Sequence, residues 1–227
     1  MSLPTTPDVL PDLNAIDLAE LFEVLNPARD LRTLFDRVHL EDLGSVGDVT
    51  TAATIDPKSV GRAVVMAREA GVISGLRTIP MLIDSYNAEL TWRPFIEDGA
   101  RVATKMKVGE LRGRLSDLLA LERPMLNLLM RLSGIATLTA RYVELTEGTH
   151  ASIYDTRKTT PCMRGLEKYA VRCGGGKCHR IGLHDAILIK DNHLAALTAR
   201  DRETHCGRPL HEMLTHAMQA VRARQPL

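Results

Sequence analysis

The chain has 227 residues, of which 44% are hydrophobic and 25% are charged, and its formal net charge is +1. This is an ordinary composition for one large or two small globular domains, and a charge so close to zero argues against bulk nucleic-acid binding. No apolar run approaches the ~18 residues of a membrane span, and the N-terminus lacks the pattern of a secretory signal, so we expect a cytoplasmic protein without membrane partners.

The first 110 residues are predicted to form a small α+β unit after a tail. Residues 1–12 contain three prolines and few apolar anchors, which indicates a disordered or loosely attached segment. Apolar residues at helical spacing predict helices, and β-branched apolar runs predict strands. The predicted elements are helices over 18–25 and 31–38, a turn-rich connection over 41–51, a strand over 63–67, a helix through 79–83, and strands over 90–96 and 101–103.

A long helix with a broad apolar face is predicted over residues 115–132. Ser133 is placed to cap a following helix and Gly134 to mark a break, so that a second helix runs over 135–145. We place the domain boundary at this break. The prediction is an N-terminal domain over 13–134 and a C-terminal domain over 135–227.

After residue 145 the pattern alternates between strand and helix, which indicates parallel βα units. Functional groups in such folds lie just past the C-terminal ends of the strands, here Arg157, Lys158 and Lys190. The predicted elements are a strand over 152–154, a helix over 163–172, a loop over 174–176, a buried strand over 186–189 and a helix over 210–222.

The stretch from Asp155 to His193 is strongly basic, with eight lysines and arginines against four acids. Guanidinium groups bind carboxylates and phosphates in a bidentate manner, and lysine supplies a compact charge. We expect three loops to converge on a small, highly anionic ligand; a solvated, salt-bridged surface is the alternative. The loops carry Arg157 and Lys158, His179 and Arg180, and Lys190.

The glycine run before Lys177 suggests a phosphate loop but does not match one. A Walker A loop starts with glycine and ends in serine or threonine, whereas Val171 and Cys178 occupy these positions. Two interpretations stay open, namely a cradle of backbone amides for an anion and a flexible turn that closes a helix.

Several thiols and imidazoles admit other chemistries. Cys173, Cys178, His179 and His184 fit no four-ligand zinc spacing, and no spacing pairs a thiol with a base, so we expect incidental thiols and no metal site. The histidines, including His193, are candidates for acid–base or for structural roles.

Arg123 interrupts an apolar helix face. It is expected either to form a salt bridge with Glu122 or Glu110, or to present its charge to a pocket or a second subunit.

Several stretches together resemble the quinolinate phosphoribosyltransferases, also called nicotinate-nucleotide pyrophosphorylases (carboxylating). They are E-D-L-G-S-V-G-D-V-T-T from Glu41, A-R-E-A-G-V-I-S-G from Ala67, L-E-R-P-M-L-N-L-L-M-R-L-S-G-I-A-T from Leu121, and the basic stretch to Leu194. The resemblance implies an α/β fold, with an N-terminal α/β sandwich followed by part of an incomplete α/β barrel (the type II phosphoribosyltransferase fold). It also implies a homodimer that converts quinolinate and phosphoribosyl pyrophosphate, with Mg²⁺, into nicotinate mononucleotide, pyrophosphate and CO₂ in de novo NAD synthesis.

The resemblance further implies a role for each matching site residue. Lys158 and Lys190 would be the catalytic cations, and Lys158 would meet the phosphoribosyl pyrophosphate. Thr156 would line the site, and Arg123 would reach into the neighbouring subunit's site. The quinolinate carboxylates would be held by Arg157, His179, Arg180 and Lys190.

The chain also departs from the family's pattern. It stops at Leu227, whereas family members continue with carboxylates for ribose and metal, so we expect a C-terminally truncated chain. Cys162 stands where the family usually has glycine, Cys178 where it usually has asparagine, and residues 200–208 form an unusual polar run. The alternative functions are an inactive remnant or interaction subunit that dimerises with a full-length homologue, and a molybdenum-transport-associated relative. The I-K-D-N-H run over 189–193 favours the quinolinate branch over that relative.

Overall fold

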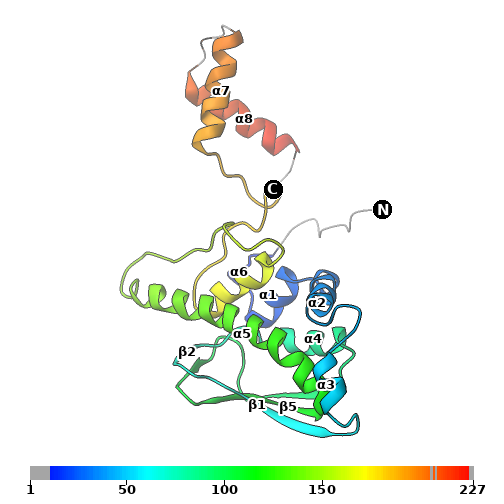
Figure 1. Cartoon of the computed structure of the whole chain (residues 1–227). Helices are drawn as coiled ribbons and strands as arrows, with labels where there is room; N and C mark the ends of the chain where they lie inside the picture. Colours follow the sequence, from blue (N-terminus) through cyan, green and yellow to red (C-terminus); the bar gives the residue numbers. More distant parts are fainter. Residues whose placement is uncertain (1–10, 205–206, 208, 225–227) are drawn as a thin grey trace. The chain divides into compact units, whose positions relative to one another are not determined.

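A computed structural model describes residues 11–204, 207 and 209–224 of the chain (Figure 1). The chain divides into two compact units, one over residues 12–181 and one that comprises the described residues from 182 onward together with residue 11. Most of the predicted tail, residues 1–10, lies outside the described residues. No helix of the described part is long and apolar enough to cross a membrane.

The unit over residues 12–181 contains a three-stranded antiparallel sheet in the order β1-β5-β3. The central strand was not predicted, because its sequence K-V-G-E-L-R-G-R combines charges and glycines. It is nevertheless buried, and Gly109 is required where the ring of Trp92 crosses it: a Cβ there would lie 2.1 Å from the indole. The strands are β1 (Val60–Met66), β3 (Leu90–Pro94) and β5 (Lys107–Arg114), with a separate pair of β2 (Gly71–Val72) and β4 (Arg101–Val102).

The helices predicted over 18–25, 31–38 and through 79–83 are present, and acidic residues cap the first of them and a short helix, α3, that was not predicted. The carboxylates of Asp17 and Asp48 accept hydrogen bonds of 2.9 Å from the third backbone amide of α1 and of α3. The predicted connection over 41–51 is shorter than expected, because α2 continues to Leu43 and Asp48 starts α3. The helices are α1 (Leu18–Leu25), α2 (Ala28–Leu43), α3 (Val49–Thr54) and, after the 3₁₀ turn η1 (Leu76–Thr78), α4 (Ile79–Ser85).

The predicted break at Ser133 and Gly134 is wrong, because α5 (Leu115–Glu144) is one continuous helix. The Ser133 hydroxyl caps nothing; it accepts from the amide of Ser74 (3.1 Å) and donates to its carbonyl (3.3 Å). One turn later, Thr137 accepts from the amide of Val72 at 2.9 Å. The hydroxyls therefore tie α5 to the β2 segment, and the boundary predicted at residue 134 falls inside a helix.

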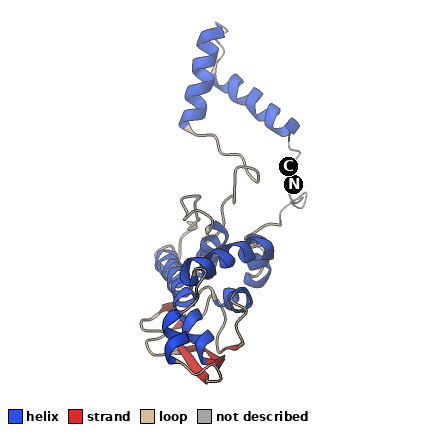
Figure 2. Ribbon diagram, turned by 45° about the vertical axis from the view of Figure 1, so that its right-hand side comes forward, coloured by secondary structure: helices blue, strands red, loops and turns tan. Residues whose placement is uncertain are grey.

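Helix α5 is the central element of this unit. Figure 1 shows β1 and β5 on one side of it and α1 and α6 (Arg164–Cys173) on the other, and Figure 2 shows the strands gathered at one side beneath the helices. Tyr169 of α6 is fully buried, packs its ring edge-to-face on Phe22, and donates to Asp98 at 3.0 Å. The fully buried apolar core also includes Leu21, Phe35, Ile79, Leu82, Leu121 and Leu132.

The C-terminal unit contains two helices, α7 (Asp191–Thr204) and α8 (Leu210–Arg224). The predicted helix over 210–222 is thereby confirmed, whereas the buried strand predicted over 186–189 is wrong. Ile187, Leu188 and Ile189 are 36%, 40% and 37% exposed and have no strand conformation. A strand needs a neighbouring strand for its backbone groups, and the sheets and the bridge formed by the described residues do not include this segment.

Candidate functional site

The basic turn over 155–158 lies beside the segment that carries His179. The predicted strand over 152–154 is reduced to one parallel bridge, between Tyr154 and Lys177. The backbone amide of Lys177 donates to the carbonyl of Ile153 (2.8 Å), and the backbone amide of Asp155 donates to the carbonyl of Lys177 (3.0 Å). This short pairing therefore brings the turn that carries Arg157 and Lys158 next to the segment that carries His179 and Arg180.

A buried ion pair lies beneath these two segments. Lys168 projects from α6 to the carboxylate of Asp155, and the two side chains are 0% and 3% exposed. The ammonium of Lys168 also donates to the carbonyl of His179 (3.1 Å), and the amide of His179 donates to Asp155 Oδ1 (2.9 Å). Sequence reasoning counted Lys168 only as one of eight basic residues and did not predict its burial.

A second pair of opposite charges joins α5 to α6. The guanidinium of Arg131 donates to Glu167 Oε1 from Nη2 (2.7 Å) and from Nε (3.1 Å), and Thr160 donates its amide to Oε2 (3.2 Å). Burial alone would raise the pKa of Glu167, but the hydrogen bonds from Arg131 and Thr160 outweigh it and lower the pKa. Glu167 is therefore a charged structural group rather than a general acid.

These groups surround a cavity of about 260 Å³. Thr156 and Lys158 are exposed residues at its wall, and the Thr156 hydroxyl accepts from the amide of Lys158 (3.1 Å), which shapes the turn. Arg157 has a buried Nε that makes no hydrogen bond within the described part of the chain. The lining residues are Arg131, Ile135, Asp155, Thr156, Lys158, Thr159, Glu167, Lys168 and Val171.

His179 is exposed, and its ring is oriented by its own backbone neighbour. Nδ1 accepts from the amide of Arg180 at 2.8 Å, so the proton of the neutral imidazole lies on Nε2. Nε2 is then the atom that can donate to an anionic ligand.

Two predicted site residues are not among the residues that line this cavity. Lys190 belongs to the C-terminal unit, where it is exposed and its amide donates to His193 Nδ1 (2.9 Å) at the start of α7. Arg123 is an exposed residue of α5 that lines a separate cavity of about 380 Å³, together with Glu41 and Asp42. This cavity shares Arg131 with the smaller one.

The thiols near the site do not support nucleophilic or zinc chemistry. Cys173 and Cys178 are buried free thiols, and burial raises the pKa of each to about 12. Nowhere in the described part of the chain do three or more His, Cys, Asp or Glu residues group as a metal site would require.

The glycines over 174–176 have a packing role. A Cβ on Gly174 would lie 2.3 Å from the carbonyl oxygen of Ala136, so this glycine lets the end of α6 approach α5. Gly175 has a positive φ of 84°. The interpretation as a turn that closes a helix accounts for both.

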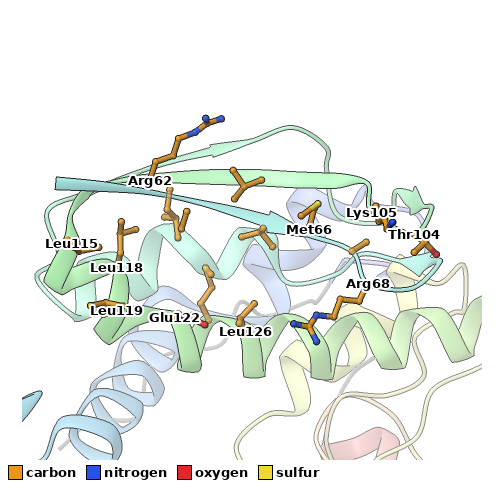
Figure 3. A pocket seen from close by; sticks show the side chains of 16 residues that line it. Arg62, Met66, Arg68, Thr104, Lys105, Leu115, Leu118, Leu119, Glu122 and Leu126 are labelled. Carbon is orange, nitrogen blue, oxygen red and sulfur yellow. The ribbon is translucent and has the colours of Figure 1, made fainter. Parts of the chain in front are cut away.

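A further cavity contains none of the predicted site residues. It has about 800 Å³ and lies between β1 and α5, as Figure 3 shows. Its walls are mostly apolar, with Arg62 and Arg68 on the strand side and Glu122 on the helix.

Comparisons with known proteins cover both parts of the chain. The family model "Quinolinate phosphoribosyl transferase, N-terminal domain" matches residues 48–133, and the C-terminal domain model matches residues 135–222. The chain is 40% identical to a nicotinate-nucleotide pyrophosphorylase [carboxylating] of Mycobacterium leprae over 188 residues, which are 82% of this chain and 61% of that protein. It is 37% identical to quinolinate phosphoribosyltransferase [decarboxylating] 1b of Nicotiana tabacum, over 81% of this chain and 52% of the relative. The chain therefore spans between half and two thirds of the length of these relatives.

Solved structures show the same fold. NadC from Streptococcus pyogenes matches with a TM-score of 0.76 and 36% identity, over 88% of this chain and 65% of the other. The nicotinate-nucleotide pyrophosphorylase of Francisella tularensis matches with a TM-score of 0.71 and 32% identity, over 85% and 66%. The predicted α/β fold class is confirmed.

Proposed function

Because the chain belongs to the quinolinate phosphoribosyltransferase family, we propose that it serves the transfer of phosphoribosyl from phosphoribosyl pyrophosphate to quinolinate. The transfer is accompanied by decarboxylation and gives nicotinate mononucleotide, pyrophosphate and CO₂, a step of NAD synthesis. The chain spans 61% of the length of the Mycobacterium leprae relative. The catalytic activity of the whole protein is therefore stated for this chain as a proposal.

The observation that carries the proposal is an uncommitted cation, Lys158, at the wall of the 260 Å³ cavity, with Arg157 next to it in the same turn. Arg157 and Lys158 make no ion pair within the described part of the chain, whereas Lys168 and Arg131 are already paired with carboxylates. Positive groups held at a partly enclosed site attract an anion more strongly than they would in bulk water. Quinolinate is a dianion and phosphoribosyl pyrophosphate carries several charges, so both fit such a site.

The family resemblance implies a role for each cation in this reaction. The ring nitrogen of quinolinate attacks C1 of the ribose as pyrophosphate leaves, and the 2-carboxylate then leaves as CO₂. Arg157 and the Nε2–H of His179 bind the quinolinate carboxylates, together with Arg180 and Lys190. Lys158 offsets charge on the pyrophosphate, and a cation near the ring stabilises the electron pair that CO₂ leaves behind.

Magnesium is the cofactor that family resemblance implies. Asp155 and Glu167, the carboxylates at the cavity, are engaged by Lys168 and Arg131, and the described residues offer no cluster of three potential ligands. The described part of the chain thus does not fit a protein-bound Mg²⁺ site.

We further propose a homodimer in which Arg123 reaches the site of the neighbouring copy. Leu119, Arg123 and Met130 are exposed at spacings that place them on one face of α5, and the two apolar side chains are 41% and 58% exposed. An arginine among exposed apolar residues is typical of the centre of a protein interface.

A cytoplasmic location is also proposed. Cys162, Cys173 and Cys178 are free thiols, which suits a reducing compartment.

The test is turnover by the purified chain with quinolinate, phosphoribosyl pyrophosphate and Mg²⁺, followed by mass detection of nicotinate mononucleotide. Nicotinate is the control substrate. Arg157→Ala and Lys190→Ala should abolish quinolinate binding, whereas Arg93→Ala, which removes an exposed arginine of β3, should not change it. Unchanged affinity in the first two variants would contradict the proposal. Binding of quinolinate without product would place the defect in the phosphoribosyl part of the site.

A further inference from the structure

The buried ion pair of Lys168 and Asp155 joins two segments that each carry predicted substrate-binding residues. Asp155 directly precedes Thr156, Arg157 and Lys158, and His179, which the pair holds, directly precedes Arg180. We infer that Lys168 and Asp155 are positioning residues: they set the separation of the two segments and do not themselves bind substrate. This inference rests on the proposed function for the identity of the ligand.

The geometry holds His179 at both of its backbone polar groups. Its amide donates to Asp155 Oδ1 (2.9 Å), and its carbonyl accepts from Lys168 Nζ (3.1 Å). Because Lys168 also donates to the same Asp155 oxygen, the three groups form a closed triangle. The triangle is anchored on α6, whose next residue, Tyr169, is fully buried. The peptide before Arg180 therefore cannot turn without breaking a buried charged contact.

Stability alone does not account for this pair. Moving two charges out of water often costs more free energy than their mutual attraction contributes. Replacing a buried ion pair with apolar residues of similar volume is commonly neutral or stabilising. The ion pair therefore contributes little to the stability of the fold, whereas its hydrogen bonds to His179 fix the orientation of the two segments.

Orientation matters for this ligand because its two carboxylates sit on adjacent carbons of a rigid ring. The groups that bind them must approach at one fixed separation. A displacement of about 1 Å in a positioned site can cost on the order of a hundredfold in function. A buried tie between the segments keeps the cations in place before the ligand arrives.

Calorimetric titration with quinolinate tests the inference on the full chain. The key variant is the double substitution Asp155→Leu with Lys168→Met, which removes both charges and leaves none unpaired. We expect it to melt near the wild-type temperature while its Kd rises about tenfold or more. Asp155→Asn and Lys168→Met alone should weaken binding similarly but also lower the melting temperature.

Leu166→Ala is the matched control, because Leu166 is a buried residue of the same helix that lines neither of the two site cavities. It should lower the melting temperature and leave the affinity for quinolinate unchanged. Wild-type affinity in the folded double variant would overturn the inference.

Hydrogen exchange separates this inference from the proposed function. In the double variant the amide of His179 should exchange about tenfold faster or more, while that of Ala170 in the buried part of α6 keeps its protection. If the wild-type chain binds no quinolinate, the proposed function fails for this chain. The exchange rate of the His179 amide in the double variant then tests the positioning role by itself. Unchanged protection of that amide would overturn the inference.

Discussion

Arg131 on α5 and Glu167 on α6 tie the two helices together at the wall of the cavity that carries Lys158. Both carboxylate oxygens of Glu167 are satisfied, one by Arg131 and one by the amide of Thr160, and Arg131 donates in addition to the Thr160 hydroxyl (2.7 Å). In Asp155, by contrast, a single oxygen, Oδ1, accepts from both Lys168 and the amide of His179. Of the two buried carboxylates, Glu167 is arranged to stabilise the fold.

Glu167→Gln should therefore destabilise the chain in a pH-dependent manner. The pKa of Glu167 is lowered in the folded state, so its contribution is complete above the unfolded value of about 4.5 and is lost as the pH falls through the folded value. Since Arg131 is 53% exposed and solvent screens the pair, we expect a loss of about 1 kcal/mol in unfolding free energy near neutral pH. Urea unfolding across the acidic range measures the difference between variant and wild type.

Glu144→Gln is the control for this series. Glu144 pairs with Arg101 at 2.7 Å, but both side chains are largely exposed, so its removal should cost less than ~0.5 kcal/mol at any pH. A gap between Glu167→Gln and wild type that is the same at low and neutral pH would show that the carboxylate charge is not what stabilises the helix pair.

Cys162→Gly should stabilise the chain. Cys162 has a φ of 65°, in the left-handed region that costs a residue with a side chain ~1–2 kcal/mol. Part of the gain is offset by the extra freedom of glycine in the unfolded chain, which leaves about 0.5–1 kcal/mol. Thermal and urea unfolding measure it, and Cys162→Ala, which keeps a Cβ, should show no gain. Equal stabilities of the two variants would mean that backbone strain is not relieved.

Helices such as α1 were predictable because their buried apolar residues recur at helical spacing within one short segment. The apolar positions Leu21, Phe22 and Leu25 define α1 without reference to the rest of the chain. The central strand β5 was missed because its burial depends on distant partners. Its Glu110 is buried only because Arg62 of β1 and Arg112 pair with it, and the hydrogen bond from Arg62 lowers its pKa. The pairing of Glu110 with Arg62, which is 48 residues away, cannot be inferred from a short stretch of sequence.

The candidate site likewise contains residues that the sequence identifies and one that only the folded structure reveals. Thr156, Arg157 and Lys158 could be identified from residue types and from a resemblance in motif. Lys168 could not, because a lysine on an amphipathic helix is expected at the surface. Its burial follows from a carboxylate 13 residues earlier and a backbone carbonyl 11 residues later, a relationship that exists only in the folded chain.

Two glycine substitutions should have opposite effects. In Gly109→Ala the new Cβ would lie 2.1 Å from the ring of Trp92, so the ring or the strand must move, at a cost of about 1–3 kcal/mol. Gly134→Ala meets nothing within 4 Å inside α5 and should stabilise by up to ~1 kcal/mol through helix propensity. Trp92 is the single tryptophan, so its emission spectrum should shift in Gly109→Ala and stay unchanged in Gly134→Ala. Loss of stability in Gly134→Ala would argue that α5 is interrupted there after all.

If Arg123 of one copy completes the site of another, two inactive variants should complement each other. Arg123→Ala and Lys158→Ala chains should each fail to bind phosphoribosyl pyrophosphate, since each lacks one cation at every site. In a mixed dimer both defects fall in one site and the other site is intact. After subunit exchange in an equal mixture, half of the dimers are mixed, so about one quarter of the wild-type binding capacity should return.

Titration calorimetry measures that capacity, and sedimentation verifies the dimer. Lys158→Ala mixed with Lys158→Gln is the matched control, because every dimer in that mixture lacks the Lys158 cation in both of its sites. Recovery in the Arg123 mixture but not in this control requires a site shared between copies. Recovery in neither, with dimers present, would place Arg123 in the site of its own chain, where the cavity that it lines already adjoins Arg131.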